Sequence, residues 1–417
     1  MARTLDVYLH RDLVGQLTQD NHGHMTFRYA EAWLEHREAR PLSHSLPLRK
    51  ERFSRKECSG FFGGILPEQG KRELVARNLG ISANNDFAML EQIGGECAGA
   101  VTFLRAGEVL QEQKDYRYRD LSDRELVDML KTLPRRPLLA GDEDVRLSLA
   151  GAQDKVAVKV SGGRISIPLG GAPSTHILKP AHGHFAGLVF NEVLCLGLAA
   201  AAGLPAARAE AGSIEGLPYA LVERYDRKQI RTPEGTAYER LHQEDFCQAL
   251  GIPSENKYQN EGGPSLRRCF DLLREVSGAP VIDLQRLLDA VIFNYLIGNH
   301  DAHGKNFSLL YDRGAGAEAR LAPLYDLVCT VYYPELSKKM AMKIGGEYLL
   351  DRVLPHHFEK LAEEAGLARP LVKRRVSELA ATVIEKLKAM DIDQPDVEKI
   401  AGIIRERSEH VVSGFAN

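Results

Sequence analysis

The chain has 417 residues, 27% of them charged, and a formal net charge of −3. This length allows two or three domains with ample cores, and the near-neutral charge argues against a nucleic-acid-binding surface that dominates the chain. The six cysteines form no C-x-x-C pair, so we expect reduced cytosolic thiols without a zinc site or disulfide framework.

The first 105 residues predict a small α/β unit. Short strands are expected at residues 6–9 and 101–105, with helical patterns between them. The start of the chain lacks the apolar segment of a signal peptide, so we expect a cytoplasmic protein. A helix is expected at residues 119–132.

Small residues at 150–152 precede a predicted strand at residues 156–160. Small side chains let backbone N–H groups approach phosphate oxygens, which is typical of a nucleotide-binding loop. The spacing is not that of a Walker A motif, and a plain turn into a strand is the alternative. The next strand, residues 174–180, carries Lys179 near its end, where an ammonium can contact phosphates; a solvated lysine is the alternative.

A core helix is expected at residues 188–202. It carries Glu192, which could pair with Lys179 or remain an exposed residue at the start of the helix. Polar residues and glycines interrupt this apolar stretch, so it does not predict a membrane span, which needs about 20 mostly apolar residues. Residues 219–226 predict a strand that runs into a polar linker, as in the adenine-binding hinge of a kinase, with a simple edge strand as the alternative.

Helical patterns dominate from residue 241 onward, at residues 284–297, 356–364, 370–389 and 397–411. The first of these ends in an apolar run that predicts a buried helix, terminated by Gly298. Polar residues delivered from a buried helix into a loop are often functional.

Asp301 and Asn306 follow that helix with the spacing of a kinase catalytic loop, in which the Asp accepts or orients a hydroxyl proton and the Asn binds magnesium. A hairpin is expected next, with strands at residues 307–311 and 319–324 and a turn at 312–316. It would bring Asp326 back beside Asn306, where both could bind one metal ion. Because Asp-x-x-x-x-Asn also arises by chance, a surface turn is the alternative.

These parts occur in the order of a protein kinase, and longer segments resemble the HipA-type serine/threonine kinases, the toxins of bacterial toxin–antitoxin pairs. Similar segments occur at residues 39–48, 61–67, 97–101, 146–155 and 304–308.

The resemblance implies an α+β, atypical two-lobed protein-kinase-like fold. It has an α/β subdomain at residues 1–105, an N-lobe at 106–226 and a mainly α-helical C-lobe at 227–417. It also implies ATP and Mg²⁺ as cofactors, with Asp301 as the base. Asn306 and Asp326 would bind the metal. The implied nucleotide-binding residues are Ala150, Gly151, Ala152, Gln153, Asp154, Lys155, Lys179, Glu223, Arg224, Tyr225, His303, Asn306 and Asp326.

Ser148 matches the autophosphorylation site of the family, whose modification is linked to ejection of the 150–155 loop and loss of activity. The resemblance further implies a small helix-turn-helix antitoxin that binds operator DNA, and a translation component such as an aminoacyl-tRNA synthetase as the protein substrate. No membrane partner is expected. Some family members carry a lysine-rich loop near DNA, but residues 344–350 are not basic here, which argues against direct DNA contact.

Two other functions stay open. One is an inactive kinase-like subunit that acts with a DNA-binding antitoxin as a co-repressor, and the other is a small-molecule kinase, which also uses Asp-x-x-x-x-Asn. Retention of Lys179, Asp301, Asn306 and Asp326 favours an active enzyme, and the family-specific segments favour a protein kinase.

Overall fold

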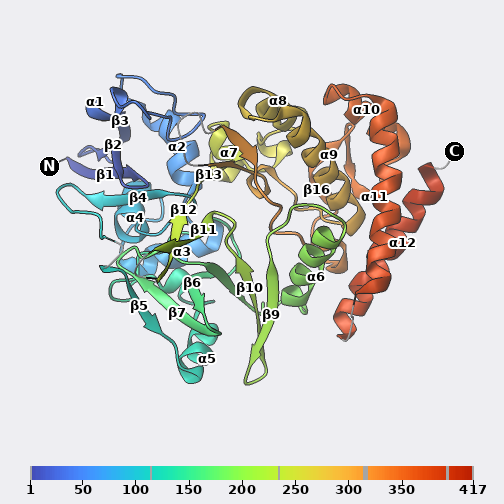
Figure 1. Cartoon of the computed structure of the whole chain (residues 1–417), viewed down its shortest axis with the longest axis horizontal. Helices are drawn as coiled ribbons and strands as arrows, with labels where there is room; N and C mark the ends of the chain where they lie inside the picture. The colour runs from blue at the N-terminus through green and yellow to red at the C-terminus, as the bar shows by residue number, and fades with distance from the viewer. Residues whose placement is uncertain (1, 113–114, 233–234, 313–317, 391–393, 416–417) are drawn as a thin grey trace. The chain divides into compact units, whose positions relative to one another are not determined.

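The computed structural model describes residues 2–112, 115–232, 235–312, 318–390 and 394–415. The chain forms two compact units, which we describe separately. Both helices and sheets are present, as expected for an α+β fold (Figure 1). Unit 1 comprises Met1–Pro180, Gly212–Glu255 and Leu310–Ala317, and unit 2 comprises Ala181–Ala211, Asn256–Leu309 and Glu318–Asn417.

Unit 1 begins with a four-stranded sheet in the order β3-β2-β1-β4 (Figure 1). The two strands predicted in this region are β1 (Arg3–Leu9) and β4 (Val101–Arg105), which pair antiparallel with Val7 opposite Phe103. Strands β2 (Asp12–Gln19) and β3 (Met25–Tyr29) were not predicted. The helices of this region are α1 (Glu31–Leu34), α2 (Arg55–Gly64), α3 (Gln69–Leu79) and α4 (Asp86–Ile93).

The second sheet has the order β5-β7-β6-β8-β10-β9. Lys179 lies in β8, opposite Ala220 of β10. The helix predicted at residues 119–132 is shorter than expected: α5 (Asp123–Thr132) starts after the capping residue Ser122, and the residues before it pair with β7. The strands are β5 (Arg117–Asp120), β6 (Val156–Ser161), β7 (Arg164–Leu169), β8 (His176–Pro180), β9 (Ala209–Ile214) and β10 (Leu217–Glu223).

One hydrophobic core joins the first sheet to the β6–β8 strands, with Leu5 and Phe27 from one and Val156 and Leu178 from the other. The predicted domain boundaries after residues 105 and 226 stay predictions.

Unit 1 also contains a hairpin that was not predicted, and a short strand and helix follow it. These elements are β11 (Arg227–Thr232), β12 (Gly235–Arg240), β13 (His242–Asp245) and α7 (Phe246–Ala249).

Unit 2 is mainly helical, and α9, α11 and α12 pack against one another (Figure 1). The five helices predicted here are present within a few residues of their expected bounds, whereas α8 was not predicted. None of the helices within the described residues is long and apolar enough to cross a membrane. The helices are α6 (Leu188–Ala201), α8 (Leu266–Val276), α9 (Pro280–Ile297), α10 (Pro355–Glu364), α11 (Arg369–Ala389) and α12 (Pro395–Phe415). The strands are β15 (Ala319–Leu321), β16 (Lys339–Ile344) and β17 (Glu347–Leu349), while β14 (Ser308–Tyr311) begins in unit 2 and ends in unit 1.

Candidate active site

The loop that carries Asp301 starts at the end of the buried helix α9. Gly298 ends the helix with φ +73°, and a Cβ at this position would lie 2.7 Å from Val331, so both conformation and space favour glycine. Asn299 Nδ2 then donates to Asn294 Oδ1 (2.7 Å), while Asn299 Oδ1 accepts the N–H of Asp301 (3.0 Å). The helix therefore positions the Asp301 backbone through a buried side-chain relay.

The Asp301 carboxylate is half exposed and is held by an aromatic donor. Tyr258 Oη donates a hydrogen bond to Asp301 Oδ1 (2.8 Å), and Asp301 Oδ2 lies 4.0 Å from His303 Nε2. The Asp301 side chain is 53% exposed, which makes it accessible to a substrate hydroxyl.

His303 is buried beside this carboxylate. Desolvation is the main cause that lowers the pKa of His303 well below its usual value, and the charges of Lys257 and Lys305 act in the same direction, against Asp326. His303 is therefore a neutral imidazole near neutral pH and adds no positive charge beside Asp301.

Asn306 ends the short 3₁₀ turn Gly304–Asn306. Its N–H donates to the carbonyl of His303 (2.9 Å). Its side-chain oxygen Oδ1 is buried and makes no hydrogen bond to any part of the chain that the structure describes. Buried acceptors are normally paired, so this oxygen is a candidate ligand atom.

The predicted hairpin after Asn306 is present as β14 and β15, and the N–H of Ala322 donates to the carbonyl of Ser308 (2.8 Å). Its expected turn at residues 312–316 lies outside the described residues, except for residue 312. The Tyr325 hydroxyl donates to the carbonyl of Lys305 (2.6 Å), so the residue before Asp326 contacts the residue before Asn306.

Asp326 has φ +52°, a conformation that non-glycine residues rarely adopt. Strained backbone of this kind clusters at active sites and ligand clamps, so it identifies Asp326 as a candidate functional residue. Its charge also acts on the buried ring of His303, which places it near the loop that carries Asp301.

The residues present fit magnesium better than a metal bound wholly by protein. Within the described residues, no group of three or more His, Cys, Asp or Glu side chains could hold a metal ion. Magnesium is usually held by one or two carboxylates together with phosphates and water. An amide oxygen from Asn306 and a carboxylate from Asp326 match that requirement.

In unit 1, Ser148 is fully buried. Its hydroxyl donates to the carbonyl of Ile65 (3.0 Å), and its N–H donates to the carbonyl of Glu96 (2.9 Å). A phosphate on this hydroxyl would meet both a carbonyl oxygen and a packed interior, so the segment has to leave this position to accommodate one.

The loop after Ser148 is closed by its own side chains. Lys155 Nζ donates to the carbonyl of Ala150 (2.6 Å), and Asp154 forms an ion pair with Lys71. Gly151 has φ +109°, and a Cβ there would lie 2.6 Å from Lys155 Nζ. The remaining loop residues Ala152 and Gln153 are half-buried.

Lys179 is buried on β8, and Glu192 is buried on α6. The expected ion pair between them stays a prediction, because the two residues belong to different units. The predicted hinge residues lie at the end of β10: Glu223 is its last residue and is exposed, and Tyr225, two residues later, donates its hydroxyl to Gln243.

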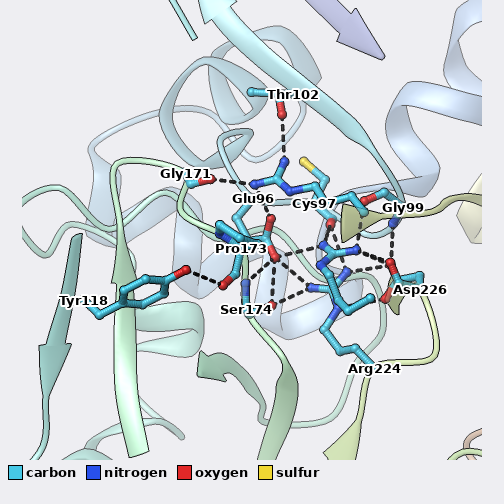
Figure 2. Close-up of polar contacts among 12 residues, drawn as sticks. Glu96, Cys97, Gly99, Thr102, Tyr118, Gly171, Pro173, Ser174, Arg224 and Asp226 are labelled. Atoms are coloured by element: carbon cyan, nitrogen blue, oxygen red, sulfur yellow. Dashed lines mark hydrogen bonds and ion pairs between the residues drawn. The ribbon is translucent and has the colours of Figure 1, made fainter. Parts of the chain in front are cut away.

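Arg224, the central hinge residue, points into a buried ion cluster in unit 1 (Figure 2). Its guanidinium pairs with Glu96 (3.3 Å) and Asp226 (2.8 Å). Arg227 and Arg240 also pair with Glu96, at 2.8 and 2.6 Å. The Arg224 side chain is therefore committed to the interior and is not available for contact with a nucleotide.

The charges in this cluster decide the ionisation of Glu96. Burial by itself would raise the pKa of Glu96, but Arg227, Arg240 and Arg224 outweigh it and lower the pKa to about 2. The same carboxylate accepts hydrogen bonds from the N–H and hydroxyl of Ser174, at 2.9 and 2.8 Å (Figure 2). Glu96 thus connects Ser174, which lies two residues before β8, with Arg224 of the predicted hinge.

Sequence reasoning missed Tyr258, Asn299 and Glu96. Tyr258 lies 43 residues before Asp301, and Glu96 lies 128 residues before Arg224. No motif spans such separations. The only local signal near Tyr258 is the glycine pair at residues 262–263, which predicts a tight turn.

Comparisons with known proteins cover nearly the whole chain. The family model described as "HipA-like C-terminal domain" matches residues 147–388, and the "HipA N-terminal domain" model matches residues 5–104. A Sinorhizobium fredii protein named "Putative kinase Y4mE" is 46% identical over 98% of this chain and 99% of its own length. "Serine/threonine-protein kinase toxin HipA" of Shewanella oneidensis is 30% identical over 94% of this chain and 92% of its own length.

A solved structure from Shewanella oneidensis MR-1, a complex of HipA, HipB and operator DNA, matches with a TM-score of 0.85. The sequence identity is 27%, and the match covers 99% of this chain and 98% of the matched chain. The chain therefore has the fold of this solved structure over nearly its whole length, which confirms the expected kinase-like α+β fold.

Proposed function

The chain belongs to the HipA family of serine/threonine kinases, and from this premise we propose that it transfers the γ-phosphoryl group of ATP to a serine or threonine hydroxyl with Asp301 as the base. The observation that carries this proposal is the arrangement around the catalytic loop. There, the half-exposed carboxylate of Asp301 is followed by the unpaired, buried Oδ1 of Asn306.

In this proposal, Asp301 accepts or orients the proton of the acceptor hydroxyl, and its backbone is held for that role by Asn299. Asn306 and Asp326 would hold Mg²⁺, which when bound would neutralise charge on the phosphates. His303 is neutral and buried, and its backbone bonds to Asp301 and Asn306 within the loop, so it is given no role in proton transfer.

The proposed nucleotide contacts in unit 1 come from three places. Lys179 would contact phosphates, as the strand lysine of kinases does, and the 150–155 loop would supply backbone N–H groups to them. Backbone groups at Glu223 and Tyr225 would meet the adenine. The burial of the Arg224 side chain limits that residue to a backbone role.

Asp301→Ala tests the assignment of the base. We expect phosphoryl transfer from γ-radiolabelled ATP to fall by at least about 100-fold, because general base catalysis contributes roughly that much or more. ATP affinity and folding should be retained. Asp271→Ala is a matched control, since Asp271 is a half-exposed carboxylate in ion pairs on α8 of the same unit.

Two results would contradict the proposal. Wild-type transfer by Asp301→Ala would show that another group is the base. A wild-type protein that binds ATP but transfers phosphate to neither protein nor water would support the alternative, an inactive binding subunit that acts as a co-repressor.

We also propose that Ser148 is autophosphorylated and that the modified protein binds ATP poorly. The complete burial of Ser148 supports the second part of this proposal, because a phosphate with about −1.5 to −2 charges cannot occupy the place of the hydroxyl beside the Ile65 carbonyl. The attached 150–155 loop would have to move with the segment.

Intact mass spectrometry of the purified protein is the test of this modification. Wild type should carry one phosphate, whereas Ser148→Ala and Asp301→Ala should carry none. Equal ATP affinity of the phosphorylated and dephosphorylated wild type would refute the regulatory part even if the site were correct.

The proposed partners are a small HipB-like helix-turn-helix antitoxin and, through it, operator DNA. The Shewanella oneidensis HipA complex with HipB and operator DNA supports this. The β16–β17 turn, Gly345-Gly346, carries no basic residue, which favours DNA contact through the antitoxin.

The proposed substrate is a cytoplasmic translation component such as an aminoacyl-tRNA synthetase. Phosphoproteomics after brief expression of wild type and Asp301→Ala would identify it.

A further inference from the structure

We propose that Tyr258 is a positioning residue for phosphoryl transfer, whose hydroxyl holds the Asp301 carboxylate in the orientation that accepts the substrate proton. The inference rests on the proposed role of Asp301 as the base. Tyr258 Oη donates to Asp301 Oδ1 at 2.8 Å. Hydrogen bonds to an ionised acceptor are stronger than neutral ones, so this contact restricts the carboxylate more than an ordinary surface hydrogen bond would.

The backbone of Tyr258 is fixed by a tight turn. Its carbonyl accepts the N–H groups of both Glu261 (2.9 Å) and Gly263 (2.8 Å). Gly262 has φ +101°, and a Cβ at Gly263 would lie 2.6 Å from the carbonyl oxygen of Asn256. Both glycines are therefore required by the turn, which is closed by backbone bonds and does not depend on the Tyr258 hydroxyl.

A single strand sets the distance between this turn and the catalytic loop. In β16, the N–H of Lys343 donates to Gln259 Oε1 (2.8 Å), in the residue that follows Tyr258. Two residues earlier on the same strand, the N–H of Ala341 donates to the carbonyl of His300 (2.7 Å), in the residue before Asp301. The two groups that form the hydrogen bond are thus anchored to one rigid element.

The ring of Tyr258 is also restrained. It meets the buried ring of His303 edge to face, with centroids 5.4 Å apart at an interplanar angle of 81°. Such packing limits rotation of the hydroxyl away from Asp301. A donor that is held in place before the reaction does not have to reorganise during it, which is the condition under which positioning residues accelerate catalysis.

Tyr258→Phe removes only the hydroxyl and tests this inference. The assay is the full-length protein with Mg²⁺ and ATP radiolabelled in the γ-phosphate, with turnover counted as phosphate on protein plus inorganic phosphate. We expect kcat to fall about tenfold or more, with an unchanged KM for ATP and an unchanged unfolding temperature, because a hydrogen bond to a charged group is lost only at the base.

Tyr332→Phe is the matched control. The Tyr332 hydroxyl also donates to an aspartate of the same unit, Asp396 Oδ1, at the same distance of 2.8 Å. Tyr332→Phe removes an equivalent hydroxyl that is bonded to Asp396 and not to Asp301. Its kcat should therefore equal that of wild type.

The inference is overturned by a Tyr258→Phe kcat within about twofold of wild type, since such a change is far below the loss of a charged hydrogen bond. It is equally overturned by a raised KM with normal kcat, or by a lowered unfolding temperature, since either would assign the hydroxyl to binding or folding. Asp301→Ala separates the two proposals: wild-type turnover by that variant refutes the base, whereas an inactive Asp301→Ala beside a normal Tyr258→Phe refutes only the role of Tyr258.

Discussion

At the scale of single residues, Asn306 and Asp326 are both kept in states that a folded chain normally avoids. A buried acceptor without a partner, such as Asn306 Oδ1, costs about 1–3 kcal/mol. A left-handed aspartate backbone, as at Asp326, adds about 1–3 kcal/mol. A metal ligand role gives both features a physical reason.

Asp326→Asn tests that role without disturbing the backbone, because asparagine also tolerates the left-handed conformation. We expect ATP affinity measured by calorimetry with Mg²⁺ to fall by about tenfold or more, because a carboxylate ligand to the metal is lost. Affinity measured with EDTA should not change. Asp271→Asn, on the surface of α8, should match wild type in both conditions. Equal Mg²⁺-dependent affinity in Asp326→Asn and wild type would remove Asp326 from the site.

At the scale of elements, the 150–155 loop depends on Gly151 in two ways. Its φ of +109° is unfavourable for other residues, and its missing side chain leaves room for Lys155 Nζ to reach the Ala150 carbonyl. The loop conformation is therefore set by a glycine and closed by a lysine four residues later.

Gly151→Ala should lower both stability and ATP affinity. The strained backbone is expected to cost about 1–2 kcal/mol, and displacement of Lys155 should disturb the 150–155 loop, which we propose binds phosphates. Gly163→Ala, in the β6–β7 turn, separates these effects. Its φ is +77°, but no atom lies within 4 Å of its added Cβ. It should lose similar stability and retain ATP affinity, as measured by thermal unfolding and calorimetry. Equal ATP affinity in both variants would contradict a nucleotide-binding role for the loop.

At the scale of the molecule, the ion cluster around Glu96 organises unit 1. Glu96 and Asp226 face two buried arginines, Arg224 and Arg227, and the half-buried Arg240 also pairs with Glu96. The backbone of Glu96 simultaneously holds the segment of Ser148. Removal of one partner from such a cluster leaves uncompensated buried charge, so the cluster acts as a unit rather than as separate ion pairs.

Glu96→Gln should lower the free energy of unfolding by about 3–5 kcal/mol at pH 7. The pKa of Glu96 is lowered in the folded state to about 2, so its stabilising contribution is present above the unfolded pKa of about 4.5 and is lost as the pH falls through the folded value. The difference between wild type and Glu96→Gln should therefore shrink between pH 4.5 and pH 2.

Denaturant unfolding at several pH values measures this difference. Asp144→Asn is the control, because the Asp144–Arg117 ion pair in the same unit is about half exposed and should contribute little. A gap between wild type and Glu96→Gln that stays constant down to pH 2 would show that Glu96 acts through packing and not through its charge.

The sequence by itself determined what can be read over short distances. The apolar run before Gly298, the Asp301–Asn306 spacing and the hairpin leading to Asp326 all lie within about one supersecondary motif, so periodicity and turn chemistry were sufficient to predict them. The long segments similar to HipA kinases were sufficient to predict the family and the α+β kinase-like fold.

Only the tertiary structure decided which distant residues support these local motifs. Tyr258 reaches Asp301 because β16 bonds to both of their neighbours, and Glu96 reaches Arg224 because unit 1 shares one core. The burial of Ser148 and the commitment of the Arg224 side chain to the interior likewise depend on packing. Such contacts join residues far apart in the chain, and a single sequence contains no periodic or local signal for them because packing complementarity is a property of the folded surfaces that meet.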